Sequence, residues 1–364
     1  MSTNVKVYKS TDRGAPTLSG TAGDLVYLLD ACLVNGYNSR TVTSVTRSGS
    51  TVTVVCPDHR IEDKAIAQID GCTPSDYNGE WYMTYVDANT LTFQITGSPA
   101  SPASGSMTCK IPGAGWTKPY TATNMRAYVQ GSKVGTSQHG ILVDDTTTTY
   151  ASFTMGETIV AIDTISGSYS PAHFMVKSGT ADTTLRPWFM VADNKTFYLT
   201  VTTASNTYRT IVFGLFKSHK VGDLYNQIIC GGDNHTDTFF TWQSGLGPGA
   251  KTPHVSRSYT QTGGAITVGK IGDKVKSSGD EIGSWGLTYP SPVDSSLYVS
   301  PFWIGESDYL IRGHFVGILA PLHQRPMAHG DTFTGTGSLA GRRYMCLYSE
   351  AGSYFVEISN TWWT

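Results

Sequence analysis

The sequence is poor in charged residues. Asp, Glu, Lys and Arg supply 15% of its 364 residues, well below the roughly 25% usual for soluble proteins. The formal net charge is −2 and no long run of one sign occurs, so the basic face with which proteins bind duplex nucleic acid does not stand out in the sequence, although folding could still gather scattered Lys and Arg. We therefore expect no nucleic acid among its partners.

Long apolar runs are missing as well. No stretch approaches the roughly 18 consecutive apolar residues of a membrane-spanning helix, and the opening MSTNVKVYKS lacks the apolar core of a secretory signal. We expect no membrane partner and synthesis in a cytoplasm. The six cysteines are scattered without a CxxC pair, and in a reducing compartment this favours buried thiols over disulfides or metal ligands.

Signatures of catalysis are also missing. The sequence contains no G-x-S-x-G elbow, P-loop or H-E-x-x-H motif. Asp280 and Glu281 suggest a glycosidase pair, but adjacent residues on a strand point to opposite faces, whereas that chemistry needs two carboxylates across one cleft. The sequence therefore predicts no enzyme and no cofactor.

The residue types that are abundant indicate a mainly β fold. Glycine contributes 39 residues and tyrosine 20; tyrosine suits a pleated surface, and glycine supplies turn positions with positive φ. One helix is predicted from Asp24 to Asn35, because apolar residues recur at helical spacing in DLVYLLDACLVN. Thr21 or Ser19 is expected to cap its start.

The chain is predicted to form a main domain that carries an insert. Residues 39–112 are expected to form a small inserted β-sandwich or barrel, with hairpin turns at Arg47-Ser48-Gly49 and at Ala88-Asn89. Residues 1–38, which contain the helix, and 113–364 are expected to form a β-sandwich or jelly-roll-like main domain, with a further division near residue 250 left open. Such an insertion requires chain ends that lie close together.

Strand-like runs continue to the end of the chain, among them TFYLTVTT, TIVFGLF, YMCLYS and SYFVEIS. The run GHFVGILAPLHQRPMAHGD is interpreted as loop-like because Pro321 and Pro326 interrupt it. The spacing of His314, His323 and His329 matches no zinc pattern, so ordinary hydrogen-bonded histidines are expected there.

The segment GGDNHTD contains the best local cluster of metal-ligating residue types. Alternate spacing would put Asp233, His235 and Asp237 on one side of an extended segment, as metal coordination requires. The alternative is a polar turn, in which Asp and Asn bond to their own backbone. We favour the turn, so no metal is predicted and the three residues remain weak candidates.

Large aromatic residues beside Gly and Pro are the candidates for binding. Such residues fill the edge of a core, anchor an interface or stack on sugars. Two tryptophans at a free tail would be costly to expose, so the C-terminal pair is expected to dock on a core or on a neighbouring subunit. The interface candidates are Trp242, Trp285, Phe302, Trp303, Trp362 and Trp363.

Several phrases resemble the uncharacterised virion structural proteins of tailed bacteriophages. GAPTLSGTAGDLVYLLDACLVNGYNSRTVTSV resembles their opening, and PSDYNGEWYMTYVDANTLTFQITGSPASPASGSMTCK resembles a small β module common in phage structural proteins. GAGWTKPYTATNMRAYV, KVGDLYNQIICGG and LIRGHFVGILAPLHQRPMAHGDTF extend the likeness over most of the chain. The resemblance implies a particle component in the virion and supplies no catalytic residue to transfer.

The expected function is therefore a structural subunit, attached to the tail or baseplate, that is synthesised in the host cytoplasm and binds other virion proteins. Copies are expected to form a homo-oligomer, with a trimer among the options. Two alternatives stay open: a capsid decoration protein on the head surface, and a host-surface module that binds glycan through its aromatic residues.

Overall fold

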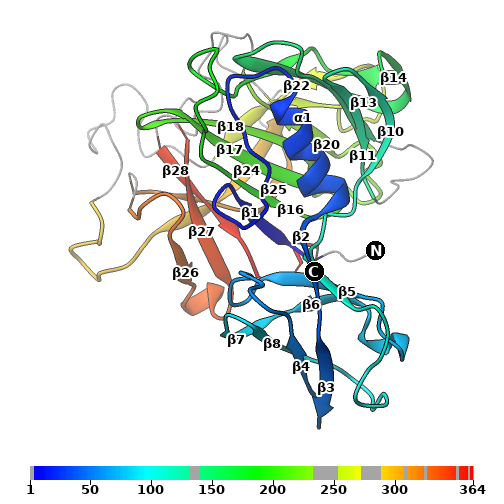
Figure 1. Ribbon diagram of the computed structural model, residues 1–364. Helices are drawn as coiled ribbons and strands as arrows, with labels where there is room; N and C mark the ends of the chain where they lie inside the picture. Colours follow the sequence, from blue (N-terminus) through cyan, green and yellow to red (C-terminus); the bar gives the residue numbers. More distant parts are fainter. Residues whose placement is uncertain are drawn as a thin grey trace.

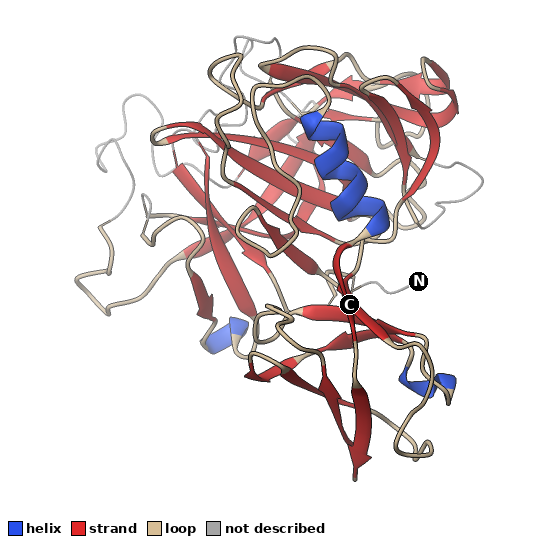
Figure 2. Ribbon diagram, viewed as in Figure 1, coloured by secondary structure: helices blue, strands red, loops and turns tan. Residues whose placement is uncertain are grey.

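The computed structural model describes residues 4–131, 139–232, 253–271, 288–306, 310–323, 326–349, 352–359 and 361–363. These residues form a mainly β protein with antiparallel sheets and one short helix packed on them (Figures 1 and 2). The predicted mainly β, sandwich-like fold class is confirmed. All six cysteines are buried thiols outside any disulfide, as the sequence predicts.

A seven-stranded central sheet forms the middle layer of the main body. Its strands, in spatial order, are β1 (Lys6–Lys9), β16 (Trp188–Ala192), β17 (Thr196–Ala204), β18 (Thr207–Leu215), β20 (Gln227–Cys230), β21 (His254–Val255) and β22 (Ile266–Thr267). Strand β17 is buried on both faces: Phe197 and Leu199 belong to one core cluster and Tyr198 to another. This double burial explains why TFYLTV has apolar residues on both faces.

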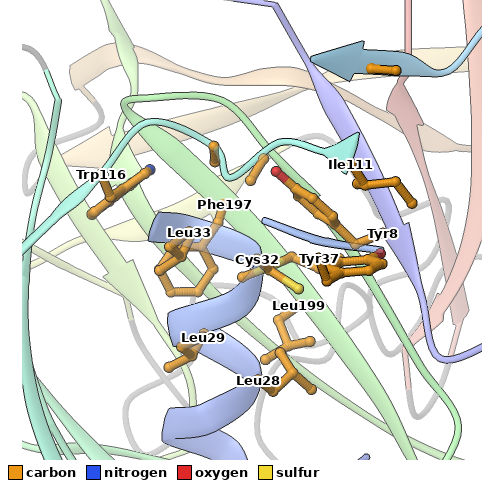
Figure 3. Close-up of a cluster of buried hydrophobic side chains, with 14 of the residues drawn as sticks. Tyr8, Leu28, Leu29, Cys32, Leu33, Tyr37, Ile111, Trp116, Phe197 and Leu199 are labelled. Carbon is orange, nitrogen blue, oxygen red and sulfur yellow. The ribbon is translucent and has the colours of Figure 1, made fainter. Parts of the chain in front are cut away.

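One face of the central sheet is covered by the helix and a second sheet. That sheet contains β10 (Thr117–Ala122), β11 (Met125–Val129), β12 (Gly140–Asp144), β13 (Tyr150–Ala161), β14 (Thr164–Tyr169) and β15 (His173–Val176). Figure 3 shows Leu28, Leu29 and Leu33 of the helix beside Phe197 and Leu199 of β17. Burial of each such side chain contributes roughly 1.5–3 kcal/mol, which fixes the helix on the sheet.

The opposite face is covered by a C-terminal sheet, which shares a core cluster with β16–β18 and β20. Its strands are β19 (Lys217–Ser218), β23 (Gly269–Ile271), β24 (Val299–Glu306), β25 (Leu310–Pro321), β26 (Thr332–Thr334), β27 (Arg343–Ser349) and β28 (Gly352–Glu357), with a 3-10 turn at Gly337–Leu339. The loop-like interpretation of GHFVGILAP is wrong, because this run lies within β25. Pro321 is the last residue of the strand, where a missing backbone N–H is tolerated.

The helix lies where the sequence predicts it, but it begins differently. It runs as α1 (Asp24–Leu29) and continues as a π-helical segment (Asp30–Asn35). The expected cap by Thr21 or Ser19 is wrong: Gly23 occupies the N-cap position without a side-chain hydrogen bond. Instead, the carboxylate of Asp145 accepts the backbone N–H groups of the first turn, as described below.

Strands from Tyr37 to Ile111 pair only with one another among the described residues. They form two four-stranded sheets, hereafter the inserted sandwich: β2 (Tyr37–Thr41), β9 (Thr108–Ile111), β5 (Ile66–Asp70) and β6 (Gly79–Tyr82) in one, and β3 (Ser44–Ser48), β4 (Thr51–Val55), β8 (Thr90–Gln94) and β7 (Thr84–Asp87) in the other. Figure 1 shows them as a lobe below the main body. A short 3-10 turn (Ser75–Tyr77) precedes β6.

The two sheets of the inserted sandwich share a core. The ring of Trp81 from β6 stacks on Phe93 from β8, with centroids 4.4 Å apart, and Met83 is buried where the chain passes from β6 to β7. The expected turn at Ala88-Asn89 is confirmed. In the other hairpin the chain reverses at Gly49 and Ser50, one residue later than predicted. Entry and exit lie together, because β2 and β9 are paired.

Candidate functional site

The predicted site residues divide into those outside and those within the described part of the chain. Asp233, His235, Asp237, Trp242 and Trp285 lie outside the described residues. Among the residues that the structure does describe, no group of three or more His, Cys, Asp or Glu could hold a metal ion.

Two of the predicted interface aromatics lie inside the chain's own core. Phe302 packs against Phe315, and Trp362 packs edge-on against Tyr198 while its indole N–H donates to the carbonyl of Glu357. Both side chains are buried. A buried aromatic cannot contact a partner in the folded chain, so the structure assigns these two a packing role.

The other two described aromatics are half-buried. Trp303 lies against the rings of His219 and His314, with centroids 5.6 and 5.5 Å away. Trp363 lies 4.5 Å from the ammonium group of Lys195 and donates a hydrogen bond to Asp193. The C-terminal tryptophans are therefore docked on the protein's own core.

A pair of histidines joins three strands. His173 Nδ1 accepts the N–H of Gly231 at 3.2 Å, so its Nε2 carries the proton and donates to His254 Nδ1 at 2.9 Å. His254 Nε2 lies 3.3 Å from the hydroxyl of Thr267. Burial and the neighbouring His254 lower the pKa of His173 to about 3. Neutral His173 therefore links β15 to β21 and to the backbone that follows β20.

Buried ion pairs hold the main body together. Lys177 binds the Asp145 carboxylate, and neither side chain is exposed. Asp145 also accepts the N–H groups of Leu25 at 2.8 Å and Val26 at 3.3 Å, which satisfies the free donors at the start of α1. Burial raises the pKa of Asp145 to about 6, although Lys177 opposes the shift.

A second buried network centres on Arg312 of β25. Its guanidinium donates to both carboxylate oxygens of Asp223, at 3.1 and 3.0 Å, and to Glu306 at 3.3 Å. Glu306 in turn accepts the N–H of Tyr259. Three separate chain segments are therefore fixed on one arginine.

Exposed apolar side chains occur on the chain segments that this network joins, and we call them the Arg312 surface. They come from the same three segments, so the network fixes their backbone. Val221 is 97% exposed, and the others are between 43% and 48% exposed. The Arg312 surface consists of Val221, Leu224, Tyr259, Leu310 and Ile311.

An open cleft lies where the main body meets the inserted sandwich. It has a volume of about 680 Å³. We call it the arginine cleft, and its lining is Thr11, Asp12, Arg13, Asp58, Arg60, Ile61, Glu62 and Tyr85. A neighbouring hollow shares Asp12 and Glu62 with it and extends to Arg343 of the C-terminal sheet.

Three arginines converge on one carboxylate in the arginine cleft. Arg13 donates to the carboxylate of Asp58, Arg60 Nε lies 2.6 Å from it, and Arg40 Nη2 lies 3.4 Å from it. Hydrogen bonds from Arg13 and Arg60 lower the pKa of Asp58 to about 2. One negative charge thus faces three positive charges.

Hydrogen bonds from buried His59 hold the loop that carries Asp58 and Arg60. Buried His59 accepts the N–H of Ile61 on Nδ1 and bonds to the carbonyl of Asp87 through Nε2, both at 2.9 Å. Asp58 and Arg60 have φ values of 53° and 54°, a left-handed conformation that non-glycine residues rarely adopt. The cleft is therefore built on a fixed backbone.

Other ion pairs balance the rest of the cleft. Lys9 binds Glu62 at 2.5 Å, and Asp12 accepts bonds from the Tyr37 hydroxyl and the N–H of Lys9. Burial raises the pKa of Asp12. The surplus of positive charge therefore lies at the Asp58 end, beside Tyr85.

Sequence reasoning missed both surfaces. Arg13, Arg40 and Arg60 are far apart in the chain, and the packing of the segment after β1 against the inserted sandwich brings Arg13 to the other two. The left-handed backbone of Asp58 and Arg60, which places their side chains in the cleft loop, could not be read from the sequence. The signal that existed was the presence of four arginines within the first 60 residues, three of which meet at Asp58.

Comparisons with known proteins assign no family. A scan of the chain against protein-family models and a search among curated proteins found no match. Within the described residues, no helix has the length and apolar character needed to cross a membrane.

Proposed function

We propose that this chain is a structural subunit of a tailed bacteriophage particle, attached to the tail or baseplate and held there by protein–protein contacts. The sequence phrases that resemble virion structural proteins support the assignment to a particle. The Arg312 surface is the single structural observation that carries the binding role.

The Arg312 surface has the properties of a protein interface. Its exposed apolar side chains belong to segments that a bonded charged network joins, so their backbone is held in place before a partner arrives. A preorganised surface loses less conformational entropy on binding.

Difference electron microscopy of intact particles, with and without the protein, tests its position. Density at the tail end supports the proposal, and density over the head favours a decoration protein. Absence from purified particles overturns the virion assignment.

A variant pair tests the Arg312 surface itself. Val221→Asp places a charge in the apolar patch and is expected to lower incorporation into particles at least roughly tenfold, because the charge must be desolvated in the interface. Val293→Asp is the matched control, since Val293 is 89% exposed and lies outside the patch. Equal incorporation of the two variants would remove the Arg312 surface from the assembly contact.

A further inference from the structure

We propose that the arginine cleft is a binding site for an acidic saccharide, with the anionic group held by the guanidiniums beside Asp58 and the sugar ring placed on Tyr85. All residues of this site belong to a single chain, so its ligand binding can be tested independently of the assembly role proposed above.

The charges around Asp58, at one end of the cleft, favour an anion. Arg13, Arg40 and Arg60 share a single carboxylate, Asp58. Like charges held this close repel one another, and a bound anion would relieve that repulsion. Arg60 presents most of its side chain to solvent, with 67% exposed, so its remaining N–H groups can donate to a carboxylate or phosphate in forked geometry.

The cleft is too large for a bare ion. A volume of about 680 Å³ lies within the roughly 300–1,000 Å³ of small-molecule sites. The carboxylates of Asp12 and Glu62 line the same cleft and can accept hydrogen bonds from hydroxyl groups. A ligand that combines one anionic group with several hydroxyls fits this lining.

Tyr85 supplies the surface for the sugar ring. It lines the arginine cleft, is 45% exposed, and its ring packs edge-on against buried His59. An aromatic ring fixed at the edge of a polar cleft offers an apolar face to the C–H groups of a sugar. The same His59 fixes the Asp58–Arg60 loop, so the anion site and the ring site are held at a constant spacing.

Isothermal titration of the full chain tests the proposal. The probes are a galacturonic acid tetramer, maltotetraose as its neutral counterpart, and inorganic phosphate. We expect the acidic tetramer to bind, with affinity falling as salt rises because the guanidiniums are exposed. Failure of the acidic tetramer to bind, or equal binding of maltotetraose, would overturn the proposal, and phosphate binding as tightly as the tetramer would reduce the site to an ion site.

Variants assign the roles. Arg60→Gln should weaken tetramer binding about tenfold by removing a charged donor, and Tyr85→Ala should weaken it about fivefold by removing the ring surface. Arg342→Gln is the matched control, an ion-paired arginine that is 52% exposed and lies outside the cleft. Tetramer affinity that is unchanged in both cleft variants would place any binding elsewhere.

Discussion

One ion-pair cluster of the inserted sandwich and one ion pair of the main body lie at different depths. In the inserted sandwich, the side chains of Asp58 and Arg60 are 41% and 67% exposed. In the main body, the side chains of Lys177 and Asp145 have no exposed surface. Pairs of opposite charges therefore occur in two environments, one exposed to water and one in the protein interior.

Depth determines what a charge can do. Removing a buried ion from water is costly, and such a pair persists only when both partners and their hydrogen bonds are in place. An exposed pair contributes little to stability and exchanges partners readily. The buried pairs of the main body are therefore structural, whereas the exposed arginines of the inserted sandwich stay available to a ligand.

The largest expected effect is at Lys177. Lys177→Met leaves the Asp145 carboxylate buried without its cation, so we expect a loss of about 3–5 kcal/mol in the free energy of unfolding. Urea denaturation monitored by circular dichroism measures it. A loss below about 1 kcal/mol would mean that the pair does not hold the helix start in place.

The next largest effect is expected at His173, in the pH dependence of the free energy of unfolding. Its pKa in the folded chain is lowered to about 3 by burial, below the ordinary value of about 6.5 that applies when the chain is unfolded. The unfolded chain therefore binds more protons between these values, and the stabilising contribution of neutral His173 is present above about pH 6.5 and lost as pH falls toward 3.

Comparing His173→Gln with the unaltered protein isolates this contribution. Between pH 7 and pH 4.5 the unaltered protein should lose roughly 2 kcal/mol more stability than the variant. The comparison with the variant is needed because Asp145 gives a pH dependence of opposite sign. Its pKa is raised to about 6, so its protonation as pH falls favours the folded state. Parallel pH profiles of the two proteins would contradict the lowered pKa.

The smallest expected effect is at Arg60. Its side chain is largely exposed, so Arg60→Gln should leave the midpoint of unfolding unchanged within error. Thermal unfolding of this variant beside Lys177→Met compares the two regions directly. A clear destabilisation at Arg60 would show that the arginine cleft is structural, like the pairs of the main body.

Local patterns predicted much of the fold. The helical spacing in DLVYLLDACLVN locates the helix, and alternation locates strands such as β4 and β8, because both signals reside within a few neighbouring residues. The start of the helix could not be predicted, since its cap is Asp145, more than a hundred residues away. Pro321 gave a wrong interpretation because a proline at a strand end is indistinguishable, in sequence, from one in a loop.

The candidate surfaces were beyond sequence reasoning. Aromatic residues were the predicted binders, but tertiary packing buried Phe302 and Trp362. Val221 carries the largest exposed apolar surface of the Arg312 surface, and nothing in its neighbours separates it from the many valines of the core. Exposure is a property of the whole fold, so a local pattern does not encode it.

The pairing of β2 with β9 has a consequence for the evolution of the gene. Tyr37 and Ile111 lie opposite one another where the chain leaves and rejoins the main body. Recombination that exchanges the codons between these points for those of another domain with adjoining ends would keep the two connections in place. It would also remove Glu80, Glu62 and Asp58, the partners of Lys6, Lys9 and Arg13. A replacement domain must therefore supply a new carboxylate for buried Lys6, or Lys6 must change with it.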